Sequence, residues 1–303
     1  YGAALCGYAA AVLVRRMRRA TRGVSLQPHR EANSNRVQTT DMFRNETCIG
    51  FSYDYFETGI SDGPGTWPSV AADTLAVLRN QASRPRGRSA RIQRGSALSV
   101  PLPPASIEAV ITDPPYDNMI DYSDASDLFY AWLKRALVTT HPEFAITSDP
   151  RGVQEKSEEI IVKRGGTAVG DHRTAERYDA LIASAFREAQ RVVRADGVVT
   201  IVFGYGEPDV WHRLLGAVTK ADLVLTGSWP ARTETGGGAD AANIVTTLTL
   251  ACRPAPAQRP VGRAADVEVE VRREVRDRVP LWERARLALT DQLMASAGPA
   301  MEV

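Results

Sequence analysis

The chain has 303 residues, of which 44% are hydrophobic and 24% charged, and its formal net charge is +1. This composition is ordinary for a globular protein, and so small a net charge names no partner. The cysteines Cys6, Cys48 and Cys252 form no C-x-x-C pair and the four histidines show no ligand spacing, which argues against a metal site or a disulfide framework and is typical of a cytoplasmic protein.

The first 90 residues are predicted to form a helical and irregular N-terminal segment. The apolar run 1–14 is too short to span a bilayer, and its charges follow it, unlike those of a signal peptide, so we expect a helix over 1–20 and no membrane partner. Residues 21–65 are polar and irregular, and the spacing of apolar residues predicts a second helix over 69–82. The arginines between 79 and 94 form either a solvated basic linker, which we favour, or a phosphate-binding segment.

From residue 91 onward, strand and helix patterns alternate. We expect a helix over 123–137 capped by Ser123 or Asp124, with Phe129 and Trp132 on its core-facing side. The polar segment 140–172 is expected to be a mobile loop or insertion. The other predicted elements are a short strand and turn at 91–98, a strand at 106–112, a helix at 174–194, a turn at 196–197, a strand at 198–204, a helix around 211–218, and strands at 222–229 and 243–252 joined through glycines 236–238.

This order predicts the α/β fold class. Buried apolar strands that alternate with amphipathic helices form a mostly parallel sheet. The last two strands are joined without an obvious helix, so we expect an antiparallel hairpin at one edge. The predicted organisation is a core over 91–254, containing the 140–172 loop, followed by a helical tail over 255–303.

The sequence Asp113-Pro114-Pro115-Tyr116 follows the strand at 106–112 directly. Ligands of open α/β sheets bind at the carboxyl ends of the strands. The prolines have a fixed φ and no N–H, so the Asp113 carboxylate and the Pro114 carbonyl form a rigid pair of acceptors, and Tyr116 adds a flat ring. This set suits the exocyclic amine of a nucleobase that has left its stack. The alternative is an Asp-Pro turn with Tyr116 in a packing role.

The longer string "ITDPPYDNMIDYSDASDLFYAWLKRAL" (111–137) resembles the S-adenosylmethionine-dependent DNA amino-methyltransferases with a D-P-P-Y motif, specifically the large prokaryotic adenine-specific DNA methylases containing a zinc ribbon. The resemblance implies a Rossmann-like methyltransferase sheet with helices on both faces. It also implies S-adenosylmethionine as cofactor, a flipped adenine of DNA as substrate, and residues 113–116 as the catalytic motif. Further matches in the same order are "FSYDYFET" (51–58), "EAQRVVRADGVVTIVFGY" (188–205), "GSWPARTE" (227–234), "NIVTTLTLACRP" (243–254) and "SAGPAMEV" (296–303).

The family's glycine-rich cofactor turn, F-x-G-x-G, has no counterpart in this sequence, and in the family it lies upstream with the ribbon. We therefore expect a C-terminal fragment with an incomplete sheet, inactive and weak in cofactor binding by itself, whose partner is the missing N-terminal part or a complementing subunit. Ser96, in "GSA" where the family often has G-D-A, and Gly204 with Gly206 are candidate cofactor contacts. The two glycines are more simply the exit loop of a core strand.

Asn118 and Tyr122, with Asp121 between them, are candidate substrate contacts, although turn capping and packing explain them equally well. Arg232 and Glu234 either border the substrate cleft or form a structural ion pair. Three alternatives to adenine methylation stay open: methylation of cytosine, methylation of RNA or of a protein amide, and a non-catalytic nucleic-acid-binding module with a methyltransferase-like fold.

Overall fold

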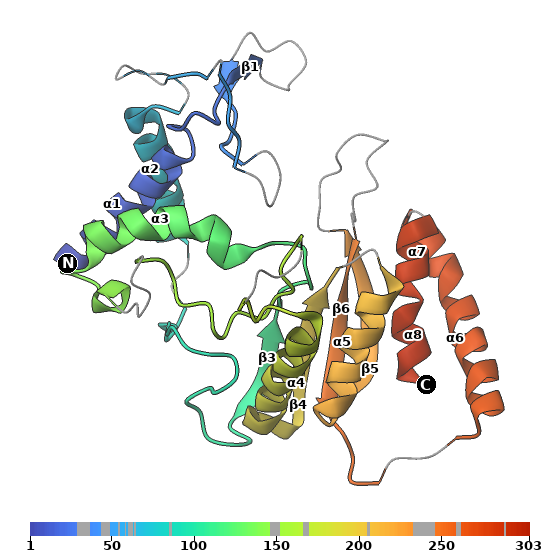
Figure 1. The fold of residues 1–303 in the computed structure, drawn as a ribbon. Helices are drawn as coiled ribbons and strands as arrows, with labels where there is room; N and C mark the ends of the chain where they lie inside the picture. The colour runs from blue at the N-terminus through green and yellow to red at the C-terminus, as the bar shows by residue number, and fades with distance from the viewer. Residues whose placement is uncertain are drawn as a thin grey trace. The chain divides into compact units, whose positions relative to one another are not determined.

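The computed structural model describes residues 1–28, 37–43, 49–53, 55–57, 59, 63, 65–84, 87–145, 152–165, 170–204, 207–232, 246–258, 262–287 and 289–303. Its contacts divide the chain into two compact units (Figure 1). Unit 1 contains residues 1–92 and 120–159, and unit 2 contains residues 93–119 and 160–303. Glycines 206 and 236–238, Glu234 and Cys48 lie outside the described residues.

Unit 1 is mainly helical. Its elements are α1 (Gly2–Met17), β1 (Leu26–Pro28), β2 (Val37–Thr39), α2 (Trp67–Ser83), α3 (Tyr122–Leu137) and the short 3-10 helix η1 (Pro142–Ala145). The predicted helices at 1–20, 69–82 and 123–137 are confirmed. Helix α1 packs against α2 and α3. Phe129 lies 6.0 Å from the ring of Phe43, whereas Trp132, expected in the core, is 50% exposed.

Unit 2 contains a four-stranded sheet in the order β3-β4-β6-β5. Strands β3 (Ile107–Thr112) and β4 (Val193–Phe203) are parallel, and β6 (Thr246–Pro254) pairs antiparallel with both β4 and β5 (Leu223–Arg232). Three strands therefore run one way and β6 runs the other (Figure 1). The α/β class and the antiparallel hairpin of β5 and β6 are confirmed, and the sheet is consistent with a Rossmann-like fold. The second strand of the hairpin, β6, lies between β4 and β5.

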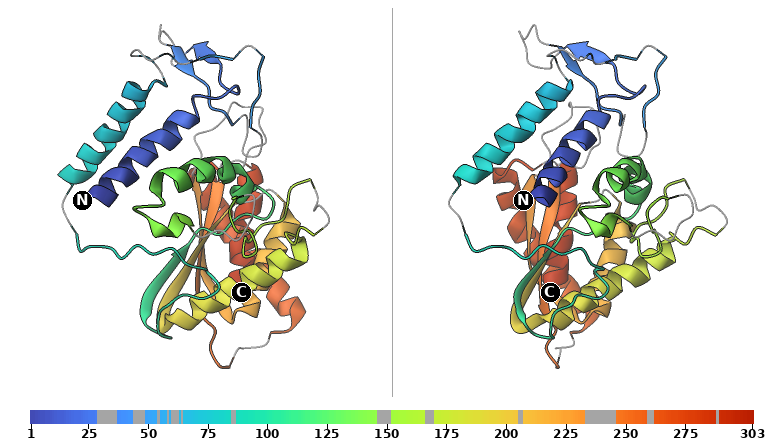
Figure 2. Two further views of the ribbon diagram at one scale, coloured as in Figure 1. Left: turned by 60° about the vertical axis from the view of Figure 1, so that its left-hand side comes forward. Right: turned by 90° about the vertical axis from the view of Figure 1, so that its left-hand side faces the viewer.

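Helices cover both faces of this sheet. Helices α4 (Ala175–Val192) and α5 (Pro208–Lys220) lie on one side, and α6 (Ala264–Arg284), α7 (Leu289–Ala295) and α8 (Ala297–Glu302) lie on the other (Figure 2). Gly298 allows α8 to approach β5, because a Cβ there would lie 1.8 Å from the Ser228 hydroxyl. The largest core residues of α4 and α5 have helical spacing: Tyr178, Ile182, Phe186, Trp211, Leu214 and Val218.

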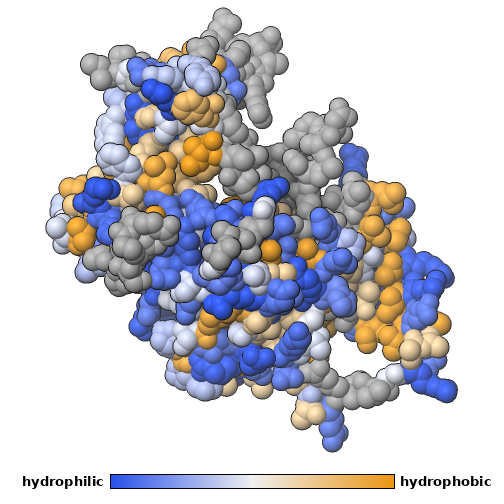
Figure 3. Space-filling view, viewed as in Figure 1, coloured by the Kyte–Doolittle hydropathy of each residue, from blue (hydrophilic) through white to orange (hydrophobic). Residues whose placement is uncertain are grey.

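Some apolar surface is left on the C-terminal helices of unit 2, as Figure 3 shows. Exposed apolar side chains there are Val269, Leu281, Leu289 and Leu293. None of the helices in the described ranges is long and apolar enough to cross a membrane.

Two local predictions are wrong. The segment 91–96 is not a strand: it has no pairing partner among the described residues, and its one large apolar side chain, Ile92, is 94% exposed. The Asp196-Gly197 turn is instead part of β4, where the register against β3 shifts between Ile107 and Ala109. Glycine is needed at 197, because a Cβ would lie 2.7 Å from the Glu108 carbonyl oxygen. This register shift is a β-bulge, which accommodates the extra residues of β4 without ending the strand.

The segment that leads into β3 is held against α4 by one ion pair. Glu188 accepts the Val100 N–H at 2.7 Å, and Arg191 donates to the carbonyls of Val100 and Leu102 at 3.0 and 3.1 Å. Glu188 also pairs with Arg191 at 2.7 Å. The hydrogen bonds from Arg191 and from the Val100 N–H lower the pKa of Glu188 to about 2. The loop 100–102 is therefore fixed on the helix before the chain enters the sheet.

Replacing Glu188 with glutamine is expected to lower the free energy of unfolding by about 1 kcal/mol at neutral pH, since a charge-assisted contact becomes a neutral one. The folded-state pKa lies below the ordinary value of 4.5, so the stabilisation is complete above that pH and is lost as the pH falls toward about 2. Urea unfolding at several pH values should show that Glu188→Gln loses less stability than the parent protein as the pH falls from 4.5 toward about 2. The exposed Glu268→Gln is the control, and equal pH dependence in all three proteins would contradict the assignment.

Candidate functional site

The site begins where β3 ends. The strand stops at Thr112, and Asp113, Pro114, Pro115 and Tyr116 form the turn that leaves the sheet. Because β3 and β4 are parallel, this turn lies at the same sheet edge as the end of β4 at Phe203. Asp113 is exposed and Pro114 is buried. The prolines have no N–H and cannot extend the strand pairing, so the turn starts at a fixed point.

Tyr116 contacts both its own motif and β4. Its hydroxyl donates to Asp113 Oδ1 at 2.6 Å. Its ring packs edge-on against Phe203 at a centroid distance of 4.8 Å, and Phe203 packs in turn against Trp211 at 5.1 Å. The aromatic contacts connect the motif to the core of unit 2. No pattern in the sequence predicts the hydrogen bond that orients the Asp113 carboxylate.

An apolar pocket of about 420 Å³ opens beside the motif, within unit 2. Asp113 is its one charged lining residue, and Pro114 and Pro115 form part of its wall. The other lining residues come from β3, from α4 and from the loops around them: Ala97, Val100, Leu102, Ile107, Ala109, Val110, Thr112, Ile160, Ile182, Ala185, Phe186, Ala189 and Val192. Its size and apolar walls suit a flat heteroaromatic ring, and Asp113 is the group that would select a hydrogen-bond donor.

The motif is held from behind by Tyr178 of α4, which is 2% exposed. The Tyr178 hydroxyl donates to the Pro115 carbonyl at 2.8 Å and accepts the Asp117 N–H at 3.3 Å. Burial raises the pKa of Tyr178 to about 12, so the hydroxyl stays protonated and remains a donor. With the Pro115 carbonyl bonded in this way, the Pro114 carbonyl has no hydrogen-bond partner among the described residues.

Asp117, the residue after the motif, is also held in place by its contacts. It is 5% exposed and has a left-handed backbone with φ +46°, which aspartate tolerates better than most residues. Arg213 of α5 donates to Asp117 Oδ1 at 2.7 Å and to Asp179 Oδ1 at 2.8 Å, and lies over the Tyr178 ring at 5.4 Å. The Asp117 carbonyl accepts the Val162 N–H at 3.0 Å. Two helices and one loop therefore fix the residue that follows the motif.

Replacing Tyr178 with phenylalanine is expected to lower the free energy of unfolding by about 1–2 kcal/mol, because the Pro115 carbonyl and the Asp117 N–H lose their common partner. Urea unfolding measures this change. Tyr53→Phe, at a tyrosine that is 96% exposed, is the matched control and should be neutral. Equal stability of the Tyr178→Phe variant and the parent protein would show that the hydroxyl does not support the motif.

The remaining candidate residues lie at different places. Gly204 is buried and follows Phe203 at the end of β4, whereas Gly206 is outside the described residues. The Ser96 hydroxyl accepts the Leu98 N–H at 3.2 Å, so it closes a local turn beside the pocket residue Ala97. Asn118 is half-buried in the turn after the motif. Tyr122 is 42% exposed and belongs to unit 1, as the first residue of α3.

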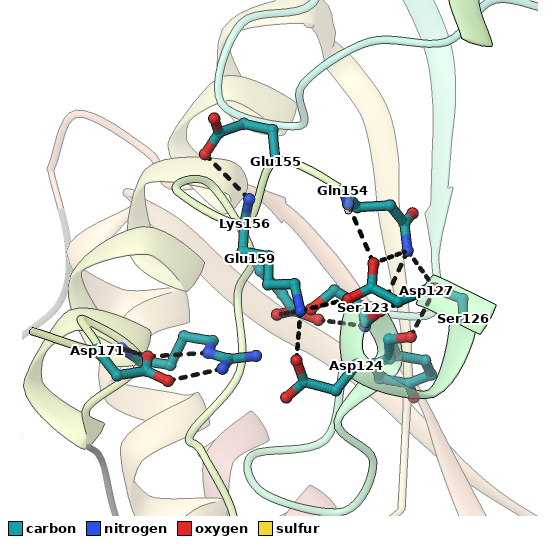
Figure 4. Close-up of polar contacts among 11 residues, drawn as sticks. Ser123, Asp124, Ser126, Asp127, Gln154, Glu155, Lys156, Glu159 and Asp171 are labelled. Carbon is teal, nitrogen blue, oxygen red and sulfur yellow. Dashed lines mark hydrogen bonds and ion pairs between the residues drawn. The ribbon is translucent and has the colours of Figure 1, made fainter. Parts of the chain in front are cut away.

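The first turn of α3 is capped from the 140–172 segment and not by its own side chains (Figure 4). Glu159 accepts hydrogen bonds from the Ser123 N–H at 2.8 Å and from the Ser123 hydroxyl at 2.5 Å. Lys156 forms ion pairs with Asp124 and with Asp127, the latter at 2.7 Å. The predicted cap at Ser123 or Asp124 is therefore wrong, because Asp121 occupies the N-cap position.

The sequence did not identify Tyr178, Asp117, Arg213, Lys156 or Glu159 as supporting residues. The helical spacing of Tyr178 indicates only a core position. Its hydroxyl bonds to Pro115, which is 63 positions away in the sequence. Asp117 directly follows the motif, which is the one local signal that could have singled it out.

Within the described residues, no three His, Cys, Asp or Glu side chains are close enough together to hold a metal ion. No protein-family model matches the chain, and no curated protein matches it. Three solved structures of a protein from Thermus thermophilus named "Putative DNA Modification Methylase" resemble it at 17%, 14% and 15% identity, each with a TM-score of 0.29. The third is a complex with S-adenosyl-L-methionine.

The matched region covers 61% of this chain and 61%, 62% and 63% of those chains, so this chain spans about three fifths of their length. A TM-score of 0.29 is too low to assign a substrate or a cofactor to this chain.

Proposed function

We propose that unit 2 is the amine-binding half of a DNA methyltransferase, which transfers a methyl group from S-adenosyl-L-methionine to the exocyclic amine of adenine. The observation that carries this proposal is the pair of acceptors at the end of β3. The Asp113 carboxylate is exposed at an apolar pocket of about 420 Å³, and the Pro114 carbonyl beside it has no partner in the described part of the chain. The resemblance of residues 111–137 to the D-P-P-Y methylases supports the choice of DNA and adenine.

The exocyclic amine is a poor nucleophile, because its lone pair is delocalised into the ring. Asp113 and the Pro114 carbonyl each accept one amine hydrogen, which favours a more tetrahedral nitrogen with its lone pair directed away from the protein. Pro115 and Tyr178 keep the two acceptors at a fixed separation, so the contribution to rate is positioning. Tyr116 lies beside the acceptors and offers a ring face to the extrahelical base, with Asn118 as a further candidate contact.

The pocket beside the motif, together with Ser96 and Gly204, does not fit the methionine part of the cofactor. The pocket has one charged lining residue, Asp113, and no cation that would hold a carboxylate. Ser96 is already engaged with Leu98, and Gly204 is buried. We therefore place the donor site mainly outside this chain, in a preceding segment or a complementing subunit. Calorimetry with the isolated chain should detect weak or no binding of S-adenosyl-L-methionine, and tight binding would move the donor site to the loop after β4.

A methylation assay tests the function. The chain, supplemented with the proposed donor-binding segment or subunit, is incubated with DNA and S-adenosyl-L-methionine carrying a labelled methyl group, and the DNA is then digested to nucleosides for mass spectrometry. Labelled N6-methyladenine supports the proposal. Labelled N4-methylcytosine would keep the reaction class and correct the base. Label in protein or RNA, or no label in DNA, would contradict it.

A further inference from the structure

Unit 1 has an aromatic and basic surface that the proposed methyl transfer does not use. The Arg22 guanidinium lies between two rings, 5.9 Å from the Phe51 centroid and 5.4 Å from that of Tyr55. Phe51 and Tyr53 meet edge to face at 5.7 Å. We call these four residues the aromatic–arginine surface. Two of its rings face solvent, since Phe51 is 63% exposed and Tyr53 is 96% exposed.

The backbone beneath this surface is firmly held. The Ser52 N–H donates to the Arg22 carbonyl at 2.9 Å, and the Phe56 N–H donates to the Val24 carbonyl at 2.8 Å. Gly23 and Gly50 approach so closely that a Cβ on Gly23 would lie 2.4 Å from the Gly50 carbonyl oxygen. The exposed rings therefore stand on a fixed support, and little conformational entropy is lost when they bind a ligand.

The segment of the sequence that carries the surface is basic. Residues 1–92 contain thirteen arginines and no lysine against seven acidic residues, a net charge of +6 in a chain whose total is +1. Arg15 and Arg18 have acidic partners, Asp73 and Asp41, whereas Arg22 forms no ion pair with any residue in the described ranges. A cavity of about 460 Å³ next to Arg22 is lined by Arg16 and Tyr55, with Glu57 as its one acidic residue.

We infer that the aromatic–arginine surface binds an unpaired stretch of a nucleic-acid strand, with bases stacked on Phe51 and Tyr53 and a phosphate at Arg22. Exposed rings stack on bases only when these have left the duplex, and an arginine among the rings suits a polyanion and disfavours an apolar protein partner. The binding requires no methyl donor and no contribution from Asp113, so it stands or falls separately from the proposed function.

Fluorescence anisotropy with the full chain tests the inference, using a labelled DNA single strand of about 20 nucleotides and the matching duplex. The double variant Phe51→Ala/Tyr53→Ala should raise the Kd for the single strand at least about tenfold, the value of one stacked base, and change the Kd for the duplex by less than about twofold. Arg22→Ala should reduce the slope of log Kd against log salt concentration by about 0.7, as expected for one lost phosphate contact.

The control is Arg272→Ala/Arg273→Ala, which removes two exposed arginines of α6 and should leave the single-strand Kd unchanged. Circular dichroism should show the same melting temperature for the aromatic variant and the parent, because the truncated rings are exposed. Unchanged single-strand affinity in the aromatic variant, an equal loss on the duplex, or no measurable binding by the parent protein would each overturn the inference. If the inference is overturned while the methylation assay still labels DNA, the proposed function stands without this surface.

Discussion

Replacing Asp113 with alanine is expected to lower the rate of the proposed methyl transfer by about 10²–10³-fold, while the fold is unchanged. The loss is large because the carboxylate is one of only two acceptors placed at the amine, and the substituted side chain offers none. The effect on stability is expected to stay within about 0.5 kcal/mol, because Asp113 is exposed and its hydrogen bond comes from the Tyr116 hydroxyl. Initial rates with a labelled methyl donor and thermal melting measure the two quantities.

Glu108→Ala is the matched control for Asp113→Ala. Glu108 is an exposed carboxylate of β3, the strand that Asp113 follows, and its ion pair with Arg194 is long, at 3.9 Å. This variant should keep the parental rate. Full activity of Asp113→Ala would remove the residue from the mechanism, and an equal loss in both variants would point to damage of β3 instead of a lost acceptor.

Arg213→Met is expected to lower the free energy of unfolding by about 3 kcal/mol, the second large effect. The substitution preserves much of the side-chain volume but leaves the buried Asp117 carboxylate without its cation, since Arg213 donates to it at 2.7 Å. Because Asp117 directly follows the motif, the same change should also reduce methyl transfer by disturbing the Asp113–Pro114 acceptor pair. Urea unfolding gives the stability, and rates measured well below the melting temperature give the activity.

A rescue experiment separates the buried charge from simple loss of packing. Asp117→Asn combined with Arg213→Met removes the buried ion pair and should recover at least about half of the lost stability, since the one carboxylate that loses its cation, Asp179, is 33% exposed. If Arg213→Met alone changes the stability by less than about 0.5 kcal/mol, the ion pair does not support the motif.

The order of the elements and their types could be predicted from the sequence, because each depends on local patterns. The apolar run before Asp113 predicts β3, and the spacing of Tyr178, Ile182 and Ala185 predicts α4. The position of β6 between β4 and β5 could not be predicted, since strand order depends on pairing between distant segments. The strand expected at 91–98 failed for the same reason: a local β pattern forms no strand without a neighbour to pair with.

The candidate site divides in the same way. The four motif residues, their place at a strand end and their acceptor chemistry could be deduced from residue types and order. Their supports come from distant parts of the chain: Tyr178 bonds to Pro115, and Arg213 bonds to Asp117 across 96 positions. Two residues of the described range 152–165, Glu159 and Lys156, contact the start of α3 through Ser123, Asp124 and Asp127. Such contacts depend on side-chain directions that no local pattern specifies.

The most direct measurement is a crystal structure of the proposed enzyme bound to a DNA duplex and a non-reactive analogue of the methyl donor. We predict one adenine outside the helix stack, with its N6 amine within hydrogen-bond distance of both the Asp113 carboxylate and the Pro114 carbonyl oxygen. An adenine that stays stacked in the duplex, or an extrahelical base whose amine is held by other groups, would contradict the role assigned to these two acceptors.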